Sequence, residues 1–111
     1  MSKAPIAPSH LRPETRRWWR QIVADYAMES HHLRLLQATC ESWDEYQAAR
    51  ETLARDGQTY QDRFGQVKAH PLVAVARDAR TSFYRGLREL ALDVNAPAES
   101  RPPGIRGMHA A

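Results

Sequence analysis

The feature that most constrains the fold is a helical pattern over residues 30–56, which is long for a chain of 111 residues. Ser30 is placed to cap its N-terminus, and Gly57 is placed to end it in a left-handed conformation. One apolar stripe follows the helical period and contains Leu33, Leu36, Cys40, Trp43 and Ala54. An apolar shoulder beside it consists of Leu35, Tyr46 and Leu53. A helix this long projects beyond its neighbours, so the shoulder is expected either to contact another subunit or to widen a single core face.

The segment RRWWRQI, residues 16–22, belongs to a helix predicted over residues 13–28. Pro13 suits its first turn, where the missing N–H would have no partner in any case. At about 100° per residue, Trp18 and Trp19 share one arc with Ile22, Val23 and Tyr26. The opposite side carries Arg16, Arg17 and Arg20. We therefore expect the tryptophans to enter a core or an interface rather than stack on bases, and the arginines to face outward.

Residues 57–71 predict a small β-hairpin, and a third helix follows it. Short strands are expected at 59–61 and 66–68, around a turn at 62–65. A hairpin this small is expected to pack on the helices, because two isolated strands are not stable in water. The third helix begins at Pro71 and carries an apolar stripe of Leu72, Ala76, Ala79, Phe83, Leu87 and Leu90. Its far face carries Arg77, Arg85 and Arg88, with Arg80 at the edge.

These elements place the chain in the mainly α class, as a three-helix domain with a long central helix and a small β-hairpin between the second and third helices. The expected boundaries are a flexible N-terminal arm over residues 1–10, the helical domain over 11–93 and a disordered, Pro- and Gly-rich C-terminal tail over 94–111. A folded part of this size buries only roughly 60–65% of the surface that its unfolded chain exposes. Oligomerisation is therefore an expected source of added stability.

Charge is distributed unevenly along the chain. Residues 1–20 carry a net +4, residues 21–62 a net −5 and residues 63–111 a net +4. Two basic blocks around an acidic middle favour a polyanionic partner, and an ordinary mixed surface is the alternative. The single cysteine fits a reducing cytosol. With no signal peptide and no membrane span in the sequence, a cytoplasmic protein without a membrane partner is expected.

No pattern in the sequence predicts catalysis. None of the five glycines lies in a phosphate-binding loop followed by Lys and Ser or Thr, which argues against P-loop ATP hydrolysis. Cys40 lies on an apolar stripe and is expected to be buried and inert. His31 and His32 face about 100° apart on a helix and cannot hold one metal ion together, and His70 is expected to cap the third helix or pack in the loop. The sequence therefore predicts a non-enzymatic binding or assembly component without metal or cofactor.

The run TYQDRFGQVKAHPLVAVARDARTSFYRGLRELAL, residues 59–92, resembles one family of small terminase subunits of tailed bacteriophages and prophages. The elements that carry the resemblance are Tyr60, Asp62-Arg63-Phe64-Gly65, His70-Pro71, Arg77-Asp78-Ala79-Arg80 and Leu87-Arg88-Glu89-Leu90. Upstream, HLRPETRRWWRQIVADYAMESHHLRLLQATCESWDEY resembles the family's opening helix and its Trp-bearing second helix. Arg12 is a departure, because a capping Ser or Thr is expected there, before the proline.

The resemblance implies a non-catalytic role in genome packaging. Such subunits assemble into rings, bind double-stranded DNA at the packaging start site and present it to the terminase large subunit, which carries the ATPase and the nuclease. Arginines on one helix face would then bind phosphates and release counterions. The expected DNA-binding residues are Arg12, Arg16, Arg17 and Arg20, with a second set of Arg77, Arg80, Arg85 and Arg88.

Alternatives remain open for the residues and for the function. Arg77 and Arg80 could instead pair with Asp78 or with acidic residues of the second helix. The surplus apolar surface at Leu35, Tyr46 and Leu53 is the expected contact between neighbouring subunits of the ring. A small helical DNA-binding regulator and a structural head–tail connector protein are the competing interpretations of the whole chain.

Overall fold

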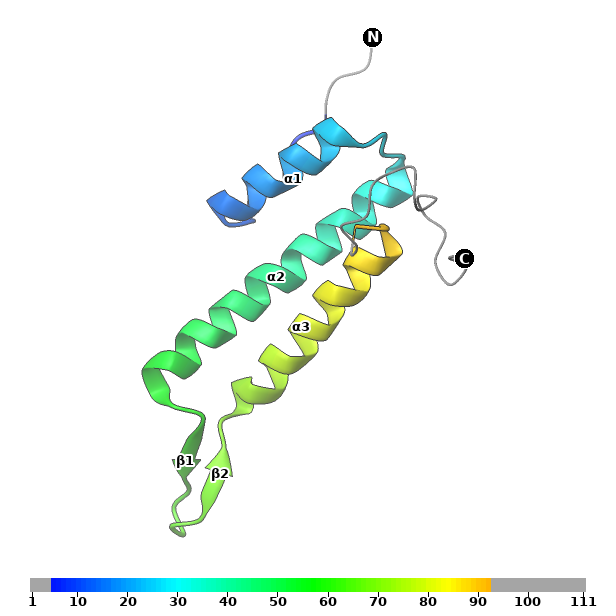
Figure 1. Ribbon diagram of the computed structural model, residues 1–111. Helices are drawn as coiled ribbons and strands as arrows, with labels where there is room; N and C mark the ends of the chain where they lie inside the picture. Colours follow the sequence, from blue (N-terminus) through cyan, green and yellow to red (C-terminus); the bar gives the residue numbers. More distant parts are fainter. Residues whose placement is uncertain (1–4, 93–111) are drawn as a thin grey trace.

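The computed structural model of the chain describes residues 5–92 and contains three helices with a two-stranded hairpin (Figure 1). In chain order the elements are α1 (Pro13–Asp25), α2 (Ser30–Asp56), β1 (Thr59–Gln61), β2 (Val67–Ala69) and α3 (Pro71–Glu89). The predicted fold class, mainly α with a long central helix and a hairpin between the second and third helices, is confirmed. The expected tail over 94–111 lies outside the described residues.

Helices α2 and α3 form a long antiparallel pair (Figure 1). Both helices contribute rows whose members are spaced alternately by four and three residues, the spacing that keeps one face of a helix toward a partner. The row on α2 consists of Leu35, Thr39, Ser42, Tyr46, Ala49 and Leu53. The row on α3 consists of Leu72, Ala76, Ala79, Phe83 and Gly86, and the C-cap residue Leu90 continues it. Several small members of these rows are buried, which allows the two helices to approach closely.

Helix α1 lies against the N-terminal half of α2 and closes the core there (Figure 1). The buried cluster consists of Ala7, Leu11, Trp19, Ile22, Leu36 and Cys40. Both tryptophans of the RRWWRQI segment point inward as predicted, since Trp19 is 3% exposed and Trp18 packs against the cluster. Residue Ala7 belongs to the expected flexible arm and is buried in this cluster, whereas its neighbour Ile6 is 86% exposed.

Four predicted positions at the ends of elements differ from the structure by one to three residues. Helix α1 ends at Asp25 rather than Met28, because the backbone of Tyr26 is already extended and starts the connection to α2. The residue that caps α2 is Glu29 rather than Ser30, and the backbone N–H of Glu29 donates to Nδ1 of His32. The second strand spans Val67–Ala69 rather than 66–68, and Gln66 closes the turn, since its carbonyl oxygen accepts the backbone N–H of Asp62.

The ends of α2 and α3 that face the hairpin are fixed by two residues. Gly57 ends α2 with a φ of 86° and a ψ of 164°, so the positive φ is as predicted but the chain leaves extended rather than left-handed helical. Nδ1 of His70 accepts the backbone N–H of Leu72 at 3.1 Å, which confirms its predicted cap on α3. Nε2 of His70 lies 3.3 Å from the carboxylate of Asp56 and ties the start of α3 to the end of α2.

The hairpin does not pack on the helices, contrary to the prediction. Strands β1 and β2 are antiparallel, with Tyr60 opposite Lys68, and all six strand residues are exposed. The turn is nevertheless well defined, because Oδ1 of Asp62 accepts the N–H groups of Phe64 and Gln66. Gly65 supplies the positive φ of 79° that a three-residue hairpin loop requires. The hairpin projects beyond the end of the α2–α3 pair (Figure 1).

Among the described residues, no helix combines the length and the apolar character needed to cross a membrane.

Candidate nucleic-acid interface

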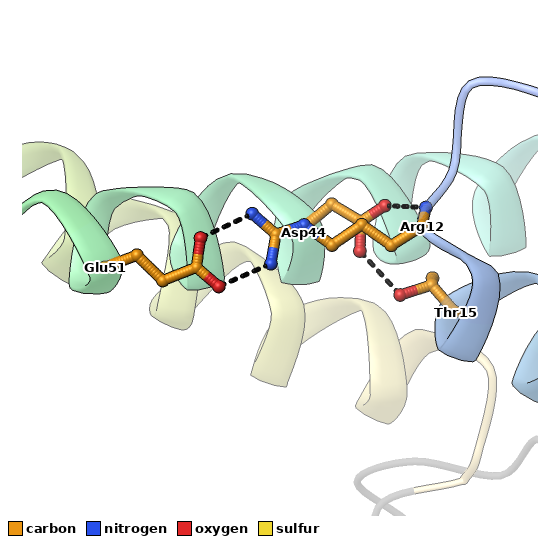
Figure 2. A network of polar contacts seen from close by, with 4 residues as sticks. All are labelled: Arg12, Thr15, Asp44 and Glu51. Atoms are coloured by element: carbon orange, nitrogen blue, oxygen red, sulfur yellow. Dashed lines mark hydrogen bonds and ion pairs between the residues drawn. The ribbon is translucent and has the colours of Figure 1, made fainter.

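The N-terminus of α1 is capped by a residue from α2, as Figure 2 shows. Arg12 stands at the cap position and offers no side-chain acceptor to the first turn. Asp44 replaces the expected Ser or Thr: Oδ2 accepts the backbone N–H of Arg12 at 2.8 Å, and Oδ1 accepts the hydroxyl of Thr15 at 2.5 Å. A carboxylate is favourable there because the helix dipole is positive at this end. The start of α1 is therefore fixed by the tertiary fold.

The guanidinium of Arg12 is engaged in a two-point ion pair within the chain (Figure 2). Nη1 and Nη2 donate to the two carboxylate oxygens of Glu51 at 2.8 and 3.0 Å. This hydrogen bonding lowers the pKa of Glu51 and raises the pKa of Arg12, because each charge stabilises the other. Arg12 thus holds α1 to α2, and contact with a phosphate would compete with that pair. Its predicted role in DNA binding stays a prediction.

Arg16 also has partners inside the chain. Its guanidinium is half-buried and donates to the carbonyl oxygens of Leu11 and Ser9, which secures the segment that leads into α1. Arg17 and Arg20, in contrast, are exposed on the outer face of α1 and form no ion pair with any of residues 5–92. Of the four arginines in the first predicted set, these two present their charge freely to solvent.

The structure divides the second predicted set between two sides of α3. Arg77 and Arg80 line a groove between α2 and α3, together with Tyr46, Leu53 and Val73. Arg85 lies on the other side of the helix, in a smaller hollow beside Leu35 and Glu89. Arg88 is exposed. Nε of Arg77 lies 3.6 Å from Oδ1 of Asp78, an exposed pair of small energetic value, so the alternative of pairing with Asp78 is realised for Arg77.

Arg50 joins Arg77 and Arg80 in the groove and is not among the arginines predicted from the sequence to bind DNA. Its guanidinium carbon lies 5.6 Å from the centre of the Tyr46 ring, within the range of a cation–π contact. The local signal was the four-residue spacing between Tyr46 and Arg50, which brings two side chains together on a helix. The net negative charge of residues 21–62 gave no indication of a basic binding surface in this segment.

The groove opens on the side of the α2–α3 pair that carries α1. Ala54 lines the groove and follows Leu36 by 18 residues, about five helical turns, so both side chains point the same way. Leu36 packs in the core that α1 covers. The groove arginines and helix α1 therefore lie on the same side of the α2–α3 pair.

The apolar shoulder of α2 lies next to α3. Leu35, Tyr46 and Leu53 are all half-buried, and they lie in the row of α2 residues that faces α3. Packing within one subunit thus explains their apolar character, which agrees with the alternative of one broad core face. Their exposed edges remain available, so the predicted subunit contact stays a prediction.

Among the described residues, the potentially reactive side chains of Cys40 and His10 are buried or paired within the chain. Cys40 is fully buried, and burial raises the pKa of its thiol to about 12, so the thiol remains protonated at neutral pH. Nε2 of His10 lies 2.7 Å from the Glu41 carboxylate on the surface. Within residues 5–92 no three His, Cys, Asp or Glu side chains come together in a way that could hold a metal ion. The arrangement offers charge and apolar surface for binding.

Comparison with known families gives a match that covers most of the chain. The family described as phage terminase, small subunit, matches residues 14–104. No curated protein and no solved structure matches.

Proposed function

The chain belongs to the family of phage terminase small subunits, and from this premise we propose that it is an oligomeric, DNA-binding component of viral genome packaging. In this proposal it binds double-stranded DNA at the packaging start site and presents it to the terminase large subunit. Small subunits of this family are generally non-catalytic, so the ATPase and nuclease steps are assigned to the large subunit. The place of action is the cytoplasm of the bacterial host.

The observation that carries the DNA-binding proposal is the pair of free arginines on the outer face of α1. Arg17 and Arg20 are three residues apart on a rigid helix, exposed, and without an ion pair to any of residues 5–92. Two such side chains can contact successive phosphates without first breaking an intramolecular bond. Arg50, Arg77 and Arg80 add positive charge on the side of the α2–α3 pair that carries α1.

The proposed binding is electrostatic. Each arginine that neutralises a phosphate releases condensed counterions, so affinity falls as salt rises. Because one subunit offers few free charges, binding by a single copy is expected to be weak. Several copies joined in one assembly raise the affinity through their effective concentration. Arg12 and Arg16 support this surface by fixing α1, and Arg85 and Arg88 remain proposed secondary contacts.

Charge reversal on α1 tests the proposal. Arg17→Glu combined with Arg20→Glu is expected to weaken binding to a fluorescent duplex at least about tenfold and to reduce the slope of log K against log salt by about two per contacting subunit. Arg34→Glu is the charge-matched control for each single substitution, Arg17→Glu or Arg20→Glu, since Arg34 is also an exposed, unpaired arginine of the described part of the chain and lies on a helix. Binding is measured by fluorescence anisotropy between 50 and about 300 mM salt, the range over which such contacts weaken.

Circular dichroism of all variants monitors the helical content. Wild-type affinity and salt slope in the double variant would show that this face of α1 does not bind DNA. Weakening by Arg34→Glu equal to that by Arg17→Glu or Arg20→Glu alone would show that only net charge matters.

A further inference from the structure

The hairpin carries apolar side chains that nothing in the described part of the chain covers. Phe64 at its tip is 76% exposed, and Val67 is 66% exposed. A two-stranded hairpin without a packed face is at best marginally stable in water. The turn residues nevertheless specify it closely, through the Asp62 hydrogen bonds and the positive φ of Gly65. An element specified in this way and left exposed is expected to be stabilised by a contact outside its own subunit.

A hollow of complementary character lies where the three helices meet. It is lined by Glu14, Thr15, Trp18, Trp43 and Phe83. The centre of the Phe83 ring lies 6.2 Å from that of Trp18 and 4.8 Å from that of Trp43. These three rings are half-buried, so each keeps part of its surface available. Clustered aromatic side chains around a small hollow are typical of the residues that dominate protein interfaces.

We propose that the hairpin tip of one copy of the chain inserts into this hollow of a second copy. The ring of Phe64 fills the space between the aromatic side chains, and the guanidinium of Arg63 pairs with the Glu14 carboxylate. The tip is arranged for such an insertion, because the Arg63 guanidinium carbon already lies 5.2 Å from the centre of the Phe64 ring. An aromatic ring with an attached cation thus meets an aromatic hollow with a carboxylate at its edge.

The tip and the hollow of one subunit cannot meet each other. From Trp43 to the end of α2 the helix runs for about 20 Å, and the extended chain from Gly57 to Phe64 adds up to about 20 Å. The hairpin also continues beyond the end of the helices, away from α1 (Figure 1). Because two different surfaces join, the contact is head-to-tail, and its repetition gives a closed ring or an open filament. This inference rests on the proposed assembly of the chain into an oligomer, and it specifies the contact between neighbouring subunits.

A mixing experiment tests the contact directly. Phe64→Ala removes the aromatic ring of the tip and leaves the hollow intact. Glu14→Arg places a charge in the hollow that repels Arg63, and it leaves the tip intact. Each variant alone is expected to be monomeric in native mass spectrometry at a concentration where the wild type is assembled, with a subunit dissociation constant raised at least about tenfold. An equimolar mixture is expected to give a heterodimer, since one functional tip meets one functional hollow. Tyr26→Ala, at another half-exposed aromatic residue, is the control and keeps the wild-type mass.

A charge exchange within one chain distinguishes loss of the contact from misfolding of a variant. Arg63→Glu together with Glu14→Arg is expected to restore assembly that each substitution alone removes. Monomeric single variants that form no heterodimer on mixing would overturn the contact. Wild-type assembly by Phe64→Ala would overturn it as well, and loss of DNA affinity without loss of assembly would assign the hairpin to DNA. A wild-type chain that stays monomeric would overturn the assembly part of the proposed function too, while the Arg17 and Arg20 experiment tests DNA binding separately.

Discussion

Replacement of Gly86 by alanine is expected to destabilise the fold, although alanine is the better helix former. Gly86 is buried between α3 and α2. A Cβ at this position would lie 2.1 Å from Oγ1 of Thr39 and 2.9 Å from both its Cβ and its Cγ2. A different side-chain rotamer of Thr39 cannot relieve the overlap, because the Cβ atom does not move when χ1 rotates. Helix α3 would have to move away from α2 and loosen the packing on either side.

Two effects of opposite sign set the size of the change. Exchanging Gly for Ala inside a helix stabilises it by about 1 kcal/mol. Overpacking a close interface costs about 1–3 kcal/mol, and the required shift of roughly 1 Å or more between two helices places this case toward the upper end. The expected net loss is about 1–2 kcal/mol, which corresponds to a fall in Tm of about 4–16 °C for a domain of this size.

Thermal unfolding followed by circular dichroism, at one protein concentration, measures this loss. Thr39→Ala in the Gly86→Ala background is expected to recover part of it, because the change removes Oγ1 and Cγ2 but leaves Cβ. The two substitutions should therefore couple by at least about 0.5 kcal/mol. A Gly86→Ala variant that melts at or above the wild-type temperature, or that shows no coupling to Thr39, would refute the close approach of the helices at this point.

Three further predictions concern the ends of helices and the carboxylates. Asp44→Ala is expected to lower the free energy of unfolding by about 2–3 kcal/mol, because the Arg12 N–H and the Thr15 hydroxyl lose a charged acceptor. Glu45→Ala, at an exposed neighbour, should change it by less than about 0.5 kcal/mol, and chemical denaturation measures both. Ala91→Gly is expected to raise the free energy of unfolding by about 0.5–1 kcal/mol, since Ala91 follows the C-cap of α3 and has a φ of 62°; an unchanged Tm would contradict this. Hydrogen bonds lower the pKa values of the carboxylates of Glu41, Glu51 and Asp56, so the unfolded chain takes up protons before the folded one as the pH falls. The free energy of unfolding, measured by urea titration, should therefore keep the full contribution of these groups at neutral pH and decline below about pH 4.5. A profile that stays flat with pH would contradict that contribution.

The helices and the hairpin could be predicted because local signals determine them. Pro13, Gly57 and Pro71 mark element ends through their backbone chemistry alone, and each stands where the sequence placed it. The hairpin followed from a turn whose Asp62 and Gly65 act within a few residues of each other. The missed boundary at Tyr26 is of another kind, since the helical pattern continues through it and the need to turn toward α2 ends the helix.

What the sequence could not show depends on contacts between distant residues. The partner of Arg12 is Glu51, 39 residues away, and the cap of α1 comes from Asp44, 32 residues away. No spacing rule links such pairs, because only the packing of α1 on α2 brings them together. The shoulder of α2 illustrates the same limit: periodicity showed that Leu35, Tyr46 and Leu53 share a direction, but not that α3 lies in that direction.

The basic and acidic blocks of the sequence are therefore not separate surfaces in the folded chain. The acidic middle is in part the binding partner of the basic N-terminal block, since Glu41, Asp44 and Glu51 hold His10 and the Arg12 segment. A count of arginines in residues 1–20 overstates the charge that can meet DNA. If DNA binds to the α1 side, its salt dependence should reflect Arg17, Arg20 and the groove arginines rather than the whole basic block. The strength of packaging-site binding then has to come from the number of copies that act together, which links DNA affinity to assembly.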